Sequence, residues 1–225
     1  TTLLKVLAGL LPLSGGSVSL RGRSPAQVPE RDRARLVAYL AQAGECHWPL
    51  SVARLVALGR LPHLMPWRGP GPADARAIAN AMRAADVTQF ADRPISTLSA
   101  GEQVRALLAR ALAVEPEVLL ADEPVAALDP SHQLQVMQLL ADRASAGHAV
   151  LVVLHDLTLA ARFCQRLVLL CDGRVLAQGS PRAVLTPDLL RRAYGVRAQI
   201  LELEDGLAVV PPIGDPSYKG LREQI

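Results

Sequence analysis

Two adjacent carboxylates stand at the end of an apolar run near the middle of the chain. Asp122 and Glu123 follow residues 118–121, VLLA, and a short continuous apolar run predicts a buried strand. Ligands of open α/β sheets bind beyond the carboxyl ends of the strands. Because adjacent side chains on a strand point to opposite sides, one carboxylate can hold Mg²⁺ while the other faces a reacting phosphate. A solvated strand end is the plainer alternative, and the pair alone does not decide between them.

Four other residues could take part in the same chemistry. Ser99 and Gly101 lie at the start of a predicted helix, where free backbone N–H groups and the helix dipole attract anions. Ser99 is the expected N-cap of that helix. Gln42 ends the run LVAYLAQ, and His155 ends the run AVLVVLH. Each has an ordinary interpretation in isolation: a capped helix, a glutamine without a special role and a structural histidine.

The elements that would position these residues alternate between strands and helices. Continuous apolar runs predict strands at 36–42, 118–122 and 149–155, the last two buried under helices on both faces of a parallel sheet. A helix over 133–146 between two of them makes a β-α-β unit. Residues 51–90 have a helical pattern that the Pro/Gly cluster LPHLMPWRGPGP interrupts. We therefore expect an α/β fold with a mostly parallel sheet flanked by helices.

The two ends of the chain predict further elements. Leucines at 3, 4, 7 and 10 indicate a helix that ends at Ser14-Gly15-Gly16, followed by a strand over 17–23 and a charged helix over 31–35. Residues 167–179 predict a strand, a turn at Asp172-Gly173 and a second strand. The segment from Pro211 onwards is rich in Pro, Gly and charge and is expected to be poorly ordered.

Composition excludes several classes of protein. The net charge of +3, carried by scattered arginines, and 3% aromatic residues do not call for a nucleic-acid partner. Cys46, Cys164 and Cys171 are too few and too unevenly spaced for a disulfide framework or a zinc site, so buried reduced thiols are expected. No apolar run approaches the ~20 residues that cross a bilayer. A role at a membrane would therefore require a partner that holds the chain there.

The linear order of these motifs resembles that of the ATP-binding subunits of ABC transporters, a family of P-loop NTPases. Gln42 is followed by LSAGEQ, LLADEP, AALD and then a strand that ends in histidine, and an ordered set is far more specific than any one motif. The resemblance runs from Thr1 to about Val196. It implies an ABC ATPase domain over 1–196 with a helical subdomain at about 48–112, and a partly disordered C-terminal extension over 197–225.

The resemblance also implies roles for the residues around the γ-phosphate of ATP. Asp122 resembles the aspartate that holds Mg²⁺, and Glu123 the general base that polarises the attacking water. Gln42 resembles the glutamine that senses Mg²⁺ and the permease. His155 resembles the switch histidine that hydrogen-bonds the γ-phosphate. Phosphoryl transfer depends on such positioning and charge neutralisation.

Other residues are implied to bind ATP. Ser99 and Gly101 match signature residues that touch the γ-phosphate of ATP held by the opposite subunit, and Asp129 closes the loop that links the two sites of the dimer. Thr1 would be the hydroxyl ligand of Mg²⁺, and Thr2 would lie near the α-phosphate. Ala100 stands where the family usually has glycine, and we expect this methyl group to be tolerated unless the position requires a positive φ.

The glycines and the lysine of the phosphate loop, G-x-x-G-x-G-K-[ST]-T, would precede Thr1 and are not among the 225 residues. The same is true of the preceding strands and of the aromatic residue that stacks on adenine. Two explanations follow. The sequence is a piece of an ordinary ATPase, which the complete downstream set favours, or the polypeptide is a catalytically incompetent fragment that binds ATP poorly.

The segment that includes GRVLAQGSP and ends in VLTPDLLRRAYGV is similar to the ATPases of importers for iron–siderophore complexes, haem and cobalamin. This likeness implies a homodimer under transmembrane permease subunits, fed indirectly by a substrate-binding protein, at the cytoplasmic face of the inner membrane. Trp48 would then lie on the surface that receives the permease, or else pack under the helical subdomain. A soluble, non-transport ABC ATPase is the alternative, but the coiled-coil insertions and basic arms of that class are not present here.

Overall fold

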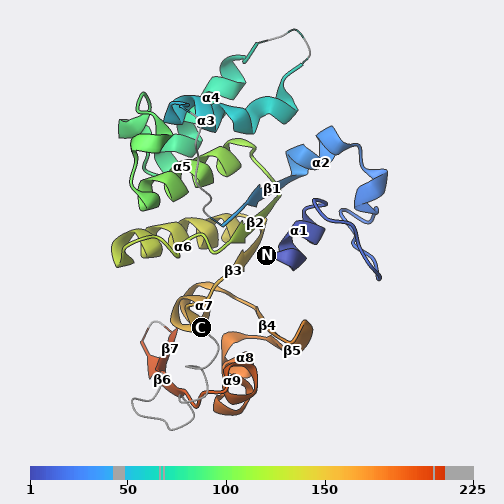
Figure 1. Ribbon diagram of the computed structural model, residues 1–225, viewed down its shortest axis with the longest axis vertical. Helices are drawn as coiled ribbons and strands as arrows, with labels where there is room; N and C mark the ends of the chain where they lie inside the picture. Colours follow the sequence, from blue (N-terminus) through green and yellow to red (C-terminus); the bar gives the residue numbers. More distant parts are fainter. Residues whose placement is uncertain (43–48, 66, 68, 205, 211–225) are drawn as a thin grey trace. The chain divides into compact units, whose positions relative to one another are not determined.

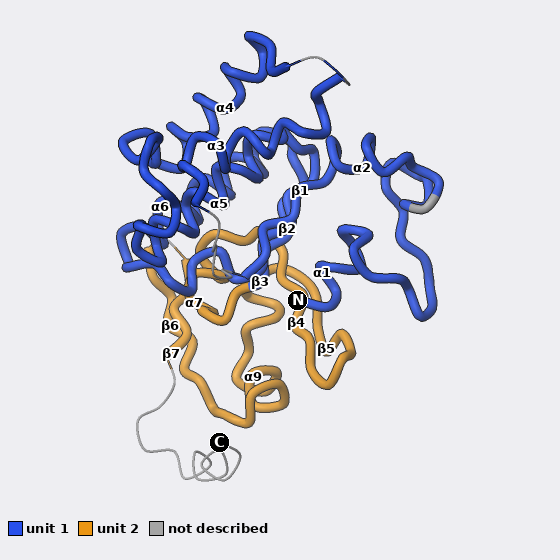
Figure 2. The backbone as a smooth tube through the Cα atoms, turned by 45° about the horizontal axis from the view of Figure 1, so that its top comes forward, with its two compact units in different colours: residues 1–153 blue, residues 154–225 orange. Residues whose placement is uncertain are grey.

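The computed structural model describes residues 1–42, 49–65, 67, 69–204 and 206–210 (Figure 1). The chain forms two compact units, residues 1–153 and residues 154–225 (Figure 2). Unit 1 contains the parallel sheet and most of the helices, and unit 2 contains two antiparallel hairpins with three short helices.

The centre of unit 1 is a three-stranded parallel sheet in the order β1-β2-β3. Its strands are β1 (Val37–Leu40), β2 (Val118–Asp122) and β3 (Ala149–Val153). In the middle strand, Leu120 is in register with Tyr39 on one side and Leu151 on the other. Because all three strands run in the same direction, their carboxyl ends meet at one edge of the sheet.

Helices cover the middle strand of this sheet. Helix α1 (Thr2–Leu7) packs on it through Leu4, Ala8 and Leu120, which form one buried cluster. Helix α5 (Ala100–Ala113) contacts β1 and helix α6 (Pro130–Ser145) contacts β3, on the other side of the sheet from α1 in Figure 1. The β2 residues 119–122 are consequently buried, which fixes the carboxyl end of that strand.

A buried arginine connects three of the helical elements of unit 1, namely the 3-10 helix η2 (Leu58–His63), α4 (Pro72–Ala84) and the end of α5. Arg60, 5% exposed, donates to Asp74 at 2.9 Å, to Glu115 at 2.8 Å and to the carbonyl of Ala113 at 2.8 Å. These bonds connect the helical segment after β1 to the end of α5. The other elements in this part of the chain are η1 (Pro25–Gln27), α2 (Glu30–Leu36), α3 (Val52–Ala57), η3 (Thr88–Phe90) and η4 (Ile95–Thr97).

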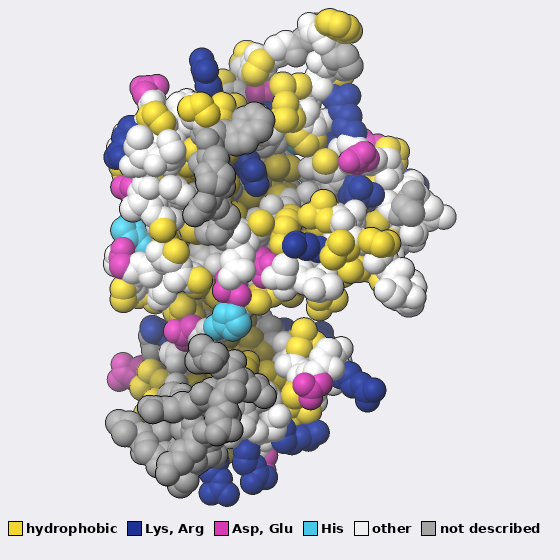
Figure 3. Space-filling view, in the orientation of Figure 1, with side chains coloured by type: hydrophobic (Ala, Val, Ile, Leu, Met, Phe, Trp, Pro, Cys, Tyr) yellow, Lys and Arg dark blue, Asp and Glu magenta, His cyan; other side chains and the backbone are white. Residues whose placement is uncertain are grey.

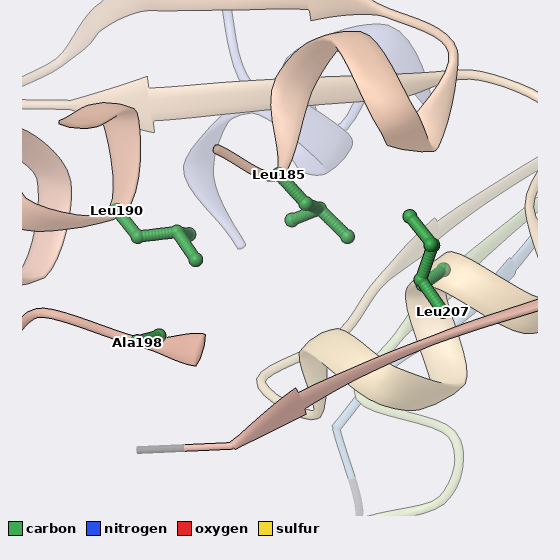
Figure 4. Packing of buried hydrophobic residues seen from close by; sticks show 5 residues of the cluster. Leu185, Leu190, Ala198 and Leu207 are labelled. Carbon is green, nitrogen blue, oxygen red and sulfur yellow. The ribbon is translucent and has the colours of Figure 1, made fainter. Parts of the chain in front are cut away.

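Unit 2 has its own hydrophobic core. Ala161, Leu185, Leu190, Ala198 and Leu207 form one buried cluster, four of them labelled in Figure 4. The elements of the unit are α7 (Leu157–Phe163), β4 (Leu167–Cys171), β5 (Arg174–Gly179), α8 (Pro181–Val184), α9 (Pro187–Tyr194), β6 (Gln199–Leu203) and β7 (Gly206–Val210). The cluster residues come from helices α7 and α9, strand β7 and the segments that follow α8 and precede β6, so the cluster links elements along the unit.

Several predicted elements are confirmed. The strand at 118–122, the helix over 31–35, the helical pattern of 51–90 and the helix between β2 and β3 are all present. Asp172 and Gly173 have φ of 49° and 71° in the turn between β4 and β5, as a tight hairpin requires. Residues from Pro211 onwards lie outside the described residues.

Other expectations were wrong. Helix α1 ends at Leu7 and not near Ser14, because Gly9 adopts φ 72° and the N–H of Leu10 bonds back to the carbonyl of Lys5 at 2.8 Å, which closes the helix. The predicted strand over 17–23 is only an isolated bridge between Leu20 and Arg23.

The expected burial of the third strand also fails. Leu151 of β3 is 38% exposed, and Ala149 is exposed as well. Within the described part of unit 1, β3 is an edge strand of the sheet and pairs only with β2. A continuous apolar run therefore predicts a strand, but it does not predict how much of that strand neighbouring helices and strands bury.

Two further expectations concern the cysteines and membrane-spanning helices. Cys164 and Cys171 are free but only half-buried, so the expected burial of these thiols is wrong, while Cys46 lies outside the described residues. In the part of the chain that the structure covers, no helix has both the length and the apolar character to traverse a bilayer.

Candidate functional site

The carboxyl edge of the sheet carries a deeply buried carboxylate. Asp122 is the last residue of β2 and is 1% exposed. The hydroxyl of Tyr39, on β1, donates to Asp122 Oδ2 at 3.2 Å. Asp122 Oδ1 is buried and has no hydrogen-bond partner, although the backbone nitrogen of Thr1 lies 3.6 Å from it. That separation is too long for a hydrogen bond.

An unpartnered oxygen on a buried carboxylate fits a bound cation. Buried polar atoms without partners are rare and call for an explanation such as an ion, and oxygen ligands suit Mg²⁺. The described residues contain no group of three His, Cys, Asp or Glu side chains that could hold a metal by themselves. Mg²⁺ sites that use one or two protein oxygens together with substrate phosphates need no such group. Asp122, with Thr1 beside it, is the part of unit 1 that meets this requirement.

Glu123 follows the strand in an unusual backbone conformation. Its φ is 49°, and its N–H donates to the carbonyl of Val153 at 3.2 Å. The strand thus ends at Asp122, and a left-handed residue, not the alternation of a strand, sets the direction of the Glu123 side chain. Gln42, two residues beyond β1, donates from Nε2 to Glu123 Oε2 at 2.9 Å. The structure therefore brings Gln42 and Glu123 together.

Ser99 and Glu102 form a capping box at the start of α5. The Ser99 hydroxyl accepts from the N–H of Glu102 at 3.3 Å, and the Glu102 carboxylate accepts from the N–H of Ser99 at 2.8 Å. The second of these bonds is the main reason that the pKa of Glu102 lies below its usual value. The predicted cap is confirmed, and the hydroxyl of Ser99 is engaged within its own helix.

Gly101 lies against the loop that follows β2. A Cβ at this position would stand 3.2 Å from Leu128 Cδ2 and 3.4 Å from the carbonyl of Ala127. The start of α5 and the loop 126–129 are therefore neighbours within one subunit. The adjacent Ala100 is exposed and does not have a positive φ, so the condition on which its methyl group was expected to be tolerated is met.

Asp129 is the N-cap of α6. Its Oδ1 accepts from the N–H of Ser131 at 3.0 Å, from the Ser131 hydroxyl at 2.8 Å and from the N–H of His132 at 3.1 Å, and its Oδ2 pairs with His132 Nδ1. The bond to the His132 side chain is the largest cause of the lowered pKa of Asp129. In this conformation, the Asp129 carboxylate caps α6, the helix that follows it, and accepts from four donors.

The remaining predicted residues are placed as follows. Thr1 and Thr2 are exposed at the start of α1, and Thr1 makes no side-chain capping bond. His155 is exposed in unit 2, before α7, and the next residue, Asp156, caps that helix by accepting from the N–H of Leu159 at 2.8 Å. Trp48 lies outside the described residues.

Sequence reasoning missed Tyr39 and His132. Tyr39 pairs with Leu120 across β1 and β2, so its side chain lies on the face that Asp122 occupies two residues later. The sequence would therefore have pointed to Tyr39 if β1 and β2 had been assumed to be neighbouring strands in this register. His132 is three residues after Asp129 in the first turn of a helix, which is the spacing at which side chains meet.

Positive charge does not form a single continuous band on the face shown in Figure 3, where Lys and Arg side chains alternate with apolar and acidic ones. This distribution matches the scattered arginines of the sequence.

The chain is similar to a large group of known proteins. The family described as "ABC transporter" matches residues 1–126. The hemin import ATP-binding protein HmuV of Nocardia farcinica is 46% identical over 202 residues, which are 90% of this chain and 69% of that protein. The ferric enterobactin transport ATP-binding protein FepC of Escherichia coli is 36% identical over 219 residues, which are 95% of this chain and 80% of that protein. The cobalamin import ATP-binding protein BtuD of Halobacterium salinarum is 38% identical over 217 residues, but this chain spans only 54% of its length.

Solved structures with the same fold include a dimeric ATP-binding cassette in a post-hydrolysis state bound to ADP and Pi. It has a TM-score of 0.70 and 28% identity, and the match covers 80% of each chain. An inward-facing metal-chelate type ABC transporter has a TM-score of 0.80 over 95% of this chain and 81% of that one; at 24% identity this likeness concerns the fold alone.

Proposed function

The chain belongs to the ABC transporter family, and from that premise we propose that it binds and hydrolyses ATP to energise an importer of metal chelates such as iron–siderophore complexes, haem or cobalamin. Relatives at 36–46% identity are named for hemin import, cobalamin import and ferric enterobactin transport. The observation that carries the proposal is the buried Asp122 carboxylate with its unpartnered Oδ1, next to the Gln42–Glu123 pair at the carboxyl edge of the sheet.

In this proposal, different residues have different roles around the γ-phosphate. Asp122 and Thr1 would hold Mg²⁺, which when bound neutralises phosphate charge. Glu123 would accept a hydrogen bond from the attacking water and act as its general base. Gln42, which already bonds to Glu123, would orient that carboxylate. His155 would donate a hydrogen bond to the γ-phosphate.

The second half of each site would come from a second copy of the chain. Ser99 and Gly101 of one subunit would meet the γ-phosphate bound to the other, and Asp129 would connect the two sites. The dimeric solved cassette supports this arrangement. The proposed ATPase domain covers residues 1–196 with a helical subdomain at about 48–112, and residues 197–225 form a C-terminal extension.

The proposed setting is the cytoplasmic face of the inner membrane. Transmembrane permease subunits would hold the ATPase dimer there, and a substrate-binding protein would deliver the chelate to the permease from the other side. The importer names of the relatives support this assignment.

ATP turnover by the intact subunit tests the proposal. Glu123→Gln removes the base and should lower the turnover rate at least 100-fold while ATP binding persists. Glu117→Gln is the matched control, because Glu117 is an exposed carboxylate that pairs with Arg21 just before β2. An inactive wild-type subunit, or a Glu123→Gln variant as fast as wild type, would refute the catalytic assignment.

A transport assay tests the cargo. The subunit should co-purify with the permease encoded beside it, and proteoliposomes that contain the complex should take up one of haem, a ferric siderophore or cobalamin in an ATP-dependent manner. Uptake of none of the three by an ATP-hydrolysing complex would exclude the metal-chelate class.

A further inference from the structure

Tyr39 is the side chain that fixes the buried carboxylate of unit 1. Its hydroxyl donates to Asp122 Oδ2 at 3.2 Å across β1 and β2. The parallel register places Tyr39 opposite Leu120, so the phenol reaches along the same face to the carboxylate two residues further on. The Tyr39 ring also packs against the cluster of Leu4, Ala8 and Leu120 under α1. The ring is thus held by packing, and the hydroxyl has a defined position.

One donor on one oxygen determines how the whole carboxylate is oriented. The terminal torsion of an aspartate is broad and roughly two-fold, so burial alone does not select which oxygen points where. The Tyr39 hydroxyl occupies Oδ2, and Oδ1 is left buried without a hydrogen-bond partner. Groups that hydrogen-bond to a metal-ligating carboxylate orient it in this way and contribute to metal affinity.

We propose that Tyr39 is a positioning residue for the metal-holding carboxylate: it engages Asp122 Oδ2 and thereby presents Oδ1 to the divalent cation that accompanies ATP. This inference rests on the proposed function, since it concerns the cation of the same site. Tyr39 touches neither the nucleotide nor the reacting atoms and acts only through Asp122.

The chemistry of the phenol suits this task. A phenol hydroxyl is a neutral donor, and here it donates to Asp122 Oδ2. A carboxylate or an amine at this position would bring a charge next to Asp122, whereas the neutral phenol does not alter the charge that attracts the cation.

Tyr39→Phe separates positioning from packing, because phenylalanine keeps the ring in the α1 cluster and removes only the hydroxyl. The probe is Mn²⁺, with binding to the intact subunit followed by the electron paramagnetic resonance signal of free Mn²⁺, in the presence of a non-hydrolysable ATP analogue. We expect the dissociation constant for Mn²⁺ to rise about tenfold. The affinity for the analogue without divalent cation should stay at the wild-type value, whereas the melting temperature should fall modestly, because the buried Asp122 carboxylate loses its donor.

Tyr194→Phe is the matched control, since Tyr194 is a half-exposed tyrosine at the end of α9 in unit 2. It should bind Mn²⁺ as the wild type does. If Tyr39→Phe also binds Mn²⁺ with wild-type affinity, Tyr39 only packs, and the proposal is overturned. A wild-type subunit that binds no Mn²⁺ overturns it as well.

Steady-state kinetics distinguish a failure of the proposed role of Tyr39 from a failure of the proposed ATPase function. A loss of positioning raises the Mg²⁺ concentration needed for half-maximal turnover more than it lowers the maximal rate, and excess Mg²⁺ restores most of the activity of Tyr39→Phe. A wild-type subunit without ATP turnover would refute the proposed function. Wild-type turnover together with an unchanged Mg²⁺ requirement in Tyr39→Phe would refute only the role of Tyr39.

Discussion

Gln42 and Glu123 are joined by a hydrogen bond of 2.9 Å from the amide Nε2 to the carboxylate Oε2, although 81 positions separate them in the sequence. Each follows a strand of the parallel sheet, β1 and β2 respectively. A movement of Gln42 would therefore act directly on the carboxylate that is proposed to be the general base.

Gln42→Glu should lower ATP turnover about tenfold at neutral pH. Two carboxylates at hydrogen-bond distance either repel each other or share a proton, and both outcomes take Glu123 away from its role as a free base. The measurement is the steady-state turnover rate of the purified subunit at saturating MgATP.

Gln42→Met is the matched control for that experiment. It has a similar length without the donor or the added charge, so it should lose less activity than Gln42→Glu. Equal, wild-type rates for both variants would mean that the bond to Glu123 does not persist in the working enzyme.

Gly101→Ala should leave the fold intact and lower turnover about tenfold. Its Cβ would meet a flexible methyl group of Leu128 at 3.2 Å, and the alanine gains roughly 0.5–1 kcal/mol in a helix, so the net change in stability should be small. The same methyl group would stand where we propose that the partner subunit's ATP docks. Ala100→Gly, one residue earlier and exposed, should turn over ATP at the wild-type rate; a normal rate for Gly101→Ala would argue against close approach of the nucleotide here.

Arg60→Met should destabilise unit 1 by about 3 kcal/mol, since removal of one partner of a buried ion pair leaves the others uncompensated. Asp74 and the carbonyl of Ala113 would each lose a donor. Urea unfolding followed by circular dichroism measures the change. Arg76→Met, an exposed position on α4, should stay within about 0.5 kcal/mol of wild type, and a similarly small effect at Arg60 would show that its bonds contribute little.

Stability should fall as the pH is lowered below about 6.5, in part because of His63. Burial and then the charge of Arg60 lower the pKa of His63, while its bond to the Val114 carbonyl, 2.9 Å from Nε2, opposes that shift. The unfolded chain thus takes up a proton near pH 6.5 before the folded chain does. The stabilisation is complete above that pH and is lost as the pH falls towards the lower folded-state pKa.

The comparison of urea unfolding at pH 7.5 and pH 5.5 checks this assignment. His63→Gln can still donate to Val114 but does not titrate, so it should lose less stability over the interval than the wild type. An identical slope in His63→Gln would assign the effect to other groups.

Local features of the fold could be predicted from the sequence. The strand that ends in Asp122, the cap at Ser99 and the turn at Asp172-Gly173 each depend on residues only a few positions apart. The length of α1 depends on a local signal too, Gly9, but the leucines beyond it suggested a longer helix. The apolar spacing continues to Leu10, whereas the helix has already ended at Leu7.

The contacts of the candidate site could not be predicted in the same way. Tyr39 and Asp122 are 83 positions apart, and they meet only because β1 and β2 are neighbours in a particular register. Types and order of residues indicated which carboxylate could hold a metal, but not which side chain orients it. Likewise, the sequence did not show that the carboxylate of Asp129, which is expected to take part in ATP binding, accepts from four donors of its own helix.

The left-handed backbone at Glu123 means that folding and the proposed catalytic role make opposing demands on one position. A non-glycine residue with φ of 49° carries strain of roughly 1 kcal/mol that glycine would not. Glycine at this position would therefore relieve the strain but remove the proposed base. A search for stabilising substitutions alone would favour that exchange, and the proposed function predicts that its product would be well folded but inactive.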